Sequence, residues 1–188
     1  MSVPSEADIL SITLTGTPLD SPTEMADAAE LFRALGIASS SWMRLEMHLD
    51  MVLLFLNQPK HSKELHKKNH PVGFRSKIKL LKRWFNQHPA LKHASGEFRG
   101  LASQIVLLSN TRNTFLHSIL STYDPKTEQA VWRSIKPASD STYKVGKHTG
   151  SIGMLLNFSA ETNKTHFDLA KVTKRITAPD VRAQLRTP

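Results

Sequence analysis

Three polar side chains between residues 112 and 117 have the types and spacing needed to act on a phosphodiester. The guanidinium of Arg112 is a permanent cation whose donor fork suits phosphate oxygens. The imidazole of His117 can act as a base, an acid or both, because histidine is the side-chain type whose ordinary pKa lies nearest to neutral pH. The amide of Asn113 can donate a hydrogen bond to the phosphate or hold the imidazole. These residues predict phosphate chemistry that needs no metal ion or other cofactor.

RNA is a substrate that such residues could cleave, because its ribose 2′-hydroxyl supplies the nucleophile. Cleavage then requires a base for the 2′-hydroxyl proton, a cation for the charge that develops on phosphorus, and an acid for the leaving 5′-oxygen. With His117 as base or acid and Arg112 as the cation, the expected products are a 2′,3′-cyclic phosphate and a 5′-hydroxyl.

The surrounding residues predict an α-helix over about residues 97–120. Arg112 falls within an apolar stripe, where a charge is costly unless it is paired or lies at a wet interface. Asn113 and His117 fall on a separate polar stripe together with Asn110, which is therefore a candidate supporting residue. The apolar stripe has the three-to-four-residue spacing of a core-facing helix and consists of Leu101, Ile105, Leu108, Phe115 and Ile119.

On a continuous helix, Arg112 and His117 would point about 140° apart around the axis. One helix does not easily aim both side chains at a single phosphate. A two-fold dimer would solve this problem by bringing two copies of the motif helix together across one groove. This geometry favours a homodimer with a composite site.

The segment Ser109–Ser118, with Asn directly after the Arg and a small residue directly after the His, resembles the R-x4-6-H motif of the HEPN family of small helical domains. The resemblance extends over about residues 26–120. Two helices are expected before the motif in that range. The first carries Trp42–Glu46 and Leu49-Asp50, and the second is basic and carries Phe74–Leu81.

The resemblance implies an up-and-down bundle of four to five helices with the motif on its last long helix. It also implies a metal-independent endoribonuclease that works as a homodimer, with Arg112, Asn113 and His117 in the catalytic site. Members of the family commonly serve as toxins or in phage and stress defence, and a neutralising partner protein often restrains them.

The net charge of +9 lies entirely between residues 60 and 99. That segment holds eleven Lys and Arg residues against two acids, and the rest of the chain holds fourteen residues of each sign. A localised positive charge is typical of proteins that bind a polyanion. We therefore expect RNA contacts from the basic helix over residues 74–87, at Lys77, Lys79, Lys82 and Arg83. The alternative is an ordinary solvated, lysine-rich face.

The sequence pattern divides the chain into three parts. Residues 1–20 form a polar N-terminal arm, residues 21–121 a helical bundle, and residues 122–188 a C-terminal attachment. The bundle begins at Ser21–Glu24, which has the residues of a helix capping box. Helical pattern then runs to about Leu56, with an interruption or a bend expected near Gly36 and Ser39–Ser41.

The C-terminal attachment is expected to contain short strands, loops and a possible final helix. Residues 129–135 alternate around Trp132 like a strand, and residues 136–153 have the composition of a loop. Residues 167–176 fit either a strand or a helix, and Thr177–Asp180 would cap a final helix. The expected fold class is mainly α: a HEPN-like bundle with a small irregular or β attachment.

Composition excludes several other classes. The chain has no cysteine, so it has neither disulfides nor thiolate metal sites. Its longest apolar run, Met51–Leu56, is too short to cross a bilayer, and we expect no membrane association. The first residues lack the basic and apolar regions of a signal peptide, which favours a cytoplasmic protein.

Two alternative interpretations stay open. Arg112 can pair with Glu46 inside the bundle, either as a purely structural bridge or to position the arginine for catalysis. In the purely structural case the protein would be a non-catalytic helical module that binds nucleic acid, a nucleotide or a partner protein. His66 and His70 have a spacing that can seat zinc on a helix, but the lysines around them and Pro71 argue against it, so we expect no metal site.

Overall fold

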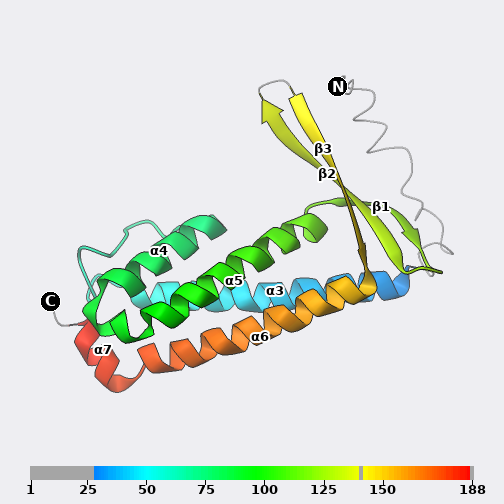
Figure 1. The fold of residues 1–188 in the computed structure, drawn as a ribbon. Coiled ribbons are helices and arrows are strands. Elements are labelled where there is room, and N and C mark those ends of the chain that lie inside the picture. Colours follow the sequence, from blue (N-terminus) through cyan, green and yellow to red (C-terminus); the bar gives the residue numbers. More distant parts are fainter. Residues whose placement is uncertain (1–27, 140–141, 187–188) are drawn as a thin grey trace. The chain divides into compact units, whose positions relative to one another are not determined.

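The computed structural model describes residues 28–139 and 142–186, which form five α-helices and one three-stranded antiparallel sheet (Figure 1). The mainly α fold class is confirmed at this level. Of the described residues, 28–40, 110–139 and 142–159 belong to one compact unit, and 41–109 and 160–186 belong to a second. No helix within the described ranges is long and apolar enough to cross a membrane.

The first described helix, α3 (Ala29–Leu56), is continuous. The interruption expected near Gly36 is therefore wrong. Ser41 is fully buried within the helix, so this serine occupies a packed helical position instead of marking a break. From Trp42 onward the fully buried positions follow the spacing of one helix face, at Leu45, Leu49, Leu53 and Leu56. The expected arm and the capping box at Ser21–Glu24 lie outside the described residues.

The basic helix α4 (Phe74–Gln87) has the bounds that the sequence predicts. A short 3-10 turn, η1 (Pro89–Leu91), separates it from the motif helix α5 (Lys92–Leu116). The rings of Phe85 and Phe98 stack with centroids 4.0 Å apart, which packs α4 against α5 within the second unit.

The sheet belongs to the first unit and consists of β1 (Ile119–Asp124), β2 (Gln129–Ser139) and β3 (Thr142–Ser151). The strand predicted around Trp132 is confirmed, whereas the loop predicted over residues 136–153 is wrong. Most of that range continues β2 or forms β3, which pairs antiparallel with β2 in a long hairpin (Figure 1).

Gly150 allows a close approach between β3 and the end of α5. A Cβ atom at this position would lie 3.1 Å from the ring of Phe115 and 3.1 Å from the ring of Trp132. These two rings meet edge to face with centroids 5.1 Å apart. The contact anchors the C-terminal turn of α5, where the candidate catalytic residues begin, to the sheet.

Much of the expected irregular C-terminal attachment is a long helix, α6 (Ile152–Ile176), and a short helix, α7 (Pro179–Leu185), follows it. The predicted final helix is confirmed. The long helix was not predicted because two of its buried positions carry Thr162 and Thr165. The hydroxyl of Thr165 donates to the carbonyl of Glu161 at 2.8 Å, so a polar side chain is satisfied by its own helix and hides the apolar periodicity.

Candidate functional site

The motif helix ends earlier than the sequence predicts. Helix α5 ends at Leu116 and β1 begins at Ile119, so His117 lies in the turn between them and not on the helix. The 140° separation expected for Arg112 and His117 on a continuous helix is therefore wrong. The backbone leaves the helical path after Leu116 and allows the imidazole to turn back toward the arginine.

The structure brings the three predicted catalytic side chains together within one chain. The Arg112 guanidinium contacts His117 Nε2 through Nη1. The same Nη1 donates to Asn113 Oδ1 at 3.0 Å. An arginine has no acceptor, so His117 Nε2 is the acceptor in this contact. The Asn113 amide oxygen thus accepts from the guanidinium, which is neither of the two roles predicted for this side chain.

The cluster is accessible to a ligand. Asn113 and His117 are exposed, and Arg112 is half-buried. A phosphate that reaches the cluster competes for the guanidinium donors, because a charge-assisted hydrogen bond to an anion is stronger than one to a neutral imidazole. Transfer of the guanidinium to the phosphate would free the Nε2 lone pair of His117. The arrangement can therefore supply a cation and a base to one phosphodiester.

The two supporting residues lie in different surroundings. Asn110 is exposed on α5, and its carbonyl accepts a hydrogen bond from Thr114 Oγ1 at 3.2 Å. Glu46 Oε2 accepts from Trp42 Nε1 at 2.9 Å, and Glu46 Oε1 lies 3.6 Å from Lys77 Nζ. The described contacts of Glu46 are thus to the indole and the lysine.

Lys77, expected to contact RNA, is buried instead. Its side chain is only 10% exposed, and its Nζ lies 2.8 Å from Asp50 Oδ1. Glu46 and Asp50 are one helical turn apart on α3, so both carboxylates face the same ammonium. The sequence pattern of α4 placed all lysines outward and gave Asp50 no role. Lys77 joins α4 to α3 within the second unit and is not a surface contact for RNA.

The other three predicted RNA-binding residues are more accessible. Lys79 is exposed, and Lys82 and Arg83 are half-buried. Arg83 donates to the carbonyl of Glu64 at 2.8 Å, so it also fixes the segment before α4. Lys79 and Arg83 line a cleft of about 570 Å³ together with Lys67. This cleft gathers three cations of the basic segment over residues 60–99.

The histidines considered for zinc do not lie on a helix, because the segment between α3 and α4 consists of turns and coil. His66 Nδ1 lies 2.7 Å from the carbonyl oxygen of Asn57, and His70 Nε2 lies 3.7 Å from Asp50 Oδ1. The described part of the chain contains no group of three His, Cys, Asp or Glu residues that is arranged to hold a metal ion.

A second pair of histidines, not considered from the sequence, joins α3 to α6. The rings of His48 and His166 meet edge to face with centroids 5.1 Å apart, and His48 Nε2 lies 2.9 Å from Thr173 Oγ1. Burial and the neighbouring His166 lower the pKa of His48. Burial and the charge of Arg44 lower the pKa of His166. The residues are 118 positions apart (166 − 48), so no local sequence pattern relates them.

Comparison with known proteins does not identify a family for this chain. No protein-family model matches the sequence, and neither the curated proteins nor the solved structures give a match. The resemblance to the HEPN motif therefore depends on Ser109–Ser118 and the helices before it.

Proposed function

We propose that this protein is a metal-independent endoribonuclease of HEPN type. The observation that supports the proposal is the contact of the Arg112 guanidinium with both Asn113 Oδ1 and His117 Nε2 at an exposed helix end. It assembles in one chain the cation and the base that attack by a 2′-hydroxyl requires.

In the proposed reaction the phosphodiester takes the place of His117 at the guanidinium of Arg112. His117 Nε2 then accepts the proton of the ribose 2′-hydroxyl, and the oxygen attacks the adjacent phosphorus. Arg112 stabilises the negative charge that develops on the phosphate oxygens, and Asn113 keeps the guanidinium in place. The imidazolium of His117 then gives its proton to the leaving 5′-oxygen, which yields a 2′,3′-cyclic phosphate and a 5′-hydroxyl.

The contact between Arg112 and His117 changes the argument for a homodimer. A dimer is no longer needed to bring the arginine and the histidine together, because the turn after Leu116 does so within one chain. We propose the dimer from the resemblance alone. The same holds for a toxin or defence role and for a neutralising partner protein. A light-scattering mass near twice 21.1 kDa would support the dimer, and a mass near 21.1 kDa would oppose it.

A second candidate function is a non-catalytic module that binds nucleic acid. The cleft lined by Lys67, Lys79 and Arg83 favours this alternative, because it offers several cations to a phosphate backbone without requiring catalysis. In this case Arg112 and His117 would make a structural contact only.

Substrate chemistry separates the two functions. The purified protein is incubated in EDTA with labelled single-stranded RNA and, separately, with the same sequence carrying 2′-O-methyl groups throughout. The nuclease is expected to cleave only the first and to leave cyclic phosphate ends. Binding of both oligonucleotides without cleavage would favour the binding module, and cleavage of the methylated strand would exclude the proposed mechanism.

A further inference from the structure

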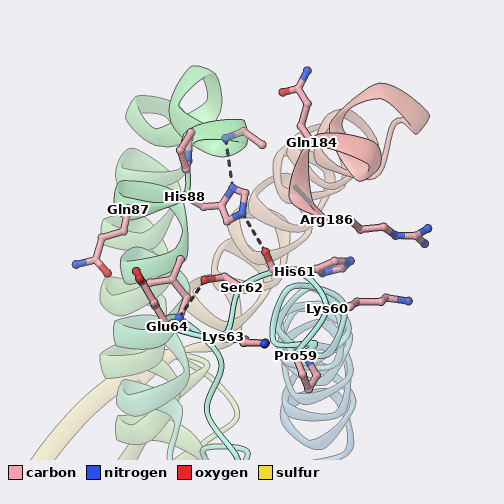
Figure 2. Close-up of a pocket in the computed structure, with 13 residues that line it drawn as sticks. Pro59, Lys60, His61, Ser62, Lys63, Glu64, Gln87, His88, Gln184 and Arg186 are labelled. Carbon is pink, nitrogen blue, oxygen red and sulfur yellow. Dashed lines mark hydrogen bonds between the residues drawn. The ribbon is translucent and has the colours of Figure 1, made fainter. Parts of the chain in front are cut away.

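The second unit contains a cleft of about 1200 Å³ that the proposed nuclease function does not use. Its walls come from the segment after α3, the end of α4 with η1, and the end of α7 (Figure 2). Three basic side chains, Lys60, Lys63 and Arg186, line it against one acid, Glu64. None of the ion pairs found among the described residues involves any of these three cations.

His61 is one of two buried histidines that line this cleft. It is 4% exposed, and its ring packs against that of Phe55 with centroids 5.2 Å apart. Its Nδ1 is buried without a hydrogen-bond partner among the described residues. A buried imidazole nitrogen without a hydrogen-bond partner costs free energy, so the ring of His61 brings an unsatisfied polar group to the edge of the cleft.

The charges around His61 indicate that a ligand of this cleft would be an anion. Burial lowers the pKa of His61, and the positive charges of Lys60 and Arg186 lower it further against the opposing effect of the Leu56 and Phe55 carbonyls. Figure 2 shows the side chains of Lys60, His61 and Arg186 extending to the same side. A bound anion would offset the repulsion between these groups.

The cleft wall behind His61 is held in place by His88, which is 6% exposed. His88 Nδ1 accepts from the backbone N–H of Ala90 at 3.3 Å, so its proton is on Nε2, which donates to the His61 carbonyl at 3.2 Å. Both ring nitrogens are therefore used, and the backbone of His61 is anchored to η1. A fixed wall reduces the ordering that a ligand must bring about when it binds.

We propose that this cleft binds a small phosphorylated molecule, with its phosphate held by Lys60, His61 and Arg186. A guanidinium fork, an ammonium and an imidazole N–H match the several oxygens of a phosphate group better than the two oxygens of a carboxylate. The volume of about 1200 Å³ exceeds what inorganic phosphate alone would fill. The organic part of the molecule would lie along the remaining wall of the cleft.

Isothermal titration calorimetry of the full chain with pyrophosphate, as the probe, tests this proposal. Pyrophosphate is expected to bind, and Lys60→Gln and Arg186→Gln are each expected to weaken binding about tenfold or more, because each removes a charge-assisted hydrogen bond. Both side chains are exposed, so neither variant should disturb folding. Lys92→Gln, an equal charge change at an exposed residue that does not line the cleft, is the control.

Absence of pyrophosphate binding would overturn the proposal, and so would an equal loss of pyrophosphate affinity in Lys92→Gln. A third contrary result would be weaker binding of a 5′-hydroxyl RNA in the two cleft variants while pyrophosphate does not bind. The last result would assign the cleft to nucleic acid. No readout here depends on RNA cleavage, so failure of this proposal and failure of the proposed nuclease function remain distinguishable.

Discussion

Replacing Lys77 by methionine should destabilise the protein, because it leaves two carboxylates facing each other without their cation. The Lys77 side chain is 10% exposed, and those of Glu46 and Asp50 are 31% and 32% exposed. Breaking a buried ion pair costs about 3–5 kcal/mol, whereas an exposed pair contributes about 0–1 kcal/mol. Since the ammonium is buried and the carboxylates are partly solvated, we expect a loss of about 2–3 kcal/mol.

Urea unfolding monitored by circular dichroism measures this loss, and a Tm lower by about 4–12 °C should accompany it. Lys79→Met is the matched control, because Lys79 is exposed two residues further along α4. The control should change stability by less than about 0.5 kcal/mol. Equal stability of Lys77→Met and the unmodified protein would refute the reasoning. So would an RNA affinity whose salt dependence changes more in Lys77→Met than in Lys79→Met.

Three other perturbations address separate parts of the structure. Arg112→Lys should keep the fold but lower RNA cleavage about 100-fold, measured as initial rates, because an ammonium cannot contact Asn113 and the phosphate in the same geometry. Gly150→Ala should cost about 1–3 kcal/mol in urea unfolding through overpacking, whereas Gly100→Ala, with open space around its Cβ position, should not destabilise. As the pH is lowered from about 7.5 to 5.5, the free energy of unfolding should decrease, and it should decrease less steeply in His166→Gln. The cause is that below the ordinary histidine pKa of 6.5 the unfolded chain takes up protons that the folded chain resists at three residues with lowered pKa values: His48, His61 and His166. A free energy of unfolding that stays constant or increases as the pH is lowered would contradict this assignment.

Elements whose buried positions are mostly large and apolar were predictable from the sequence, and elements whose pattern is dominated by threonines, glycines or exposed polar residues were not. Helix α4 has its predicted bounds because its buried residues are large and regularly spaced, such as Leu81 and Trp84. Helix α6 was missed because Thr162 and Thr165 occupy buried positions. Strand β3 has the composition of a loop, because exposed polar residues and glycines occupy much of it. Its stability comes from pairing with β2, which no local sequence pattern shows.

The residue types of the candidate site were predictable, but their geometry was not. The sequence pattern selects Arg112, Asn113 and His117, yet their contact depends on where α5 ends, and boundaries are poorly determined by periodicity. Lys77 was assigned to the surface because charge in a sequence does not say which lysine meets a carboxylate from another helix. Asp50, its partner, is 27 residues away (77 − 50), and only the fold brings the two together.

We propose that His117, in contact with Arg112, acts as the base in RNA cleavage that needs no metal. The most direct test is the initial rate of cleavage of a labelled single-stranded RNA in EDTA by the unmodified protein, by His117→Ala and by His93→Ala, which removes an exposed histidine from α5. The account predicts cleavage with cyclic phosphate ends, a rate at least about 100-fold lower in His117→Ala, and an unchanged rate in His93→Ala. Equal cleavage by the unmodified protein and His117→Ala would contradict it.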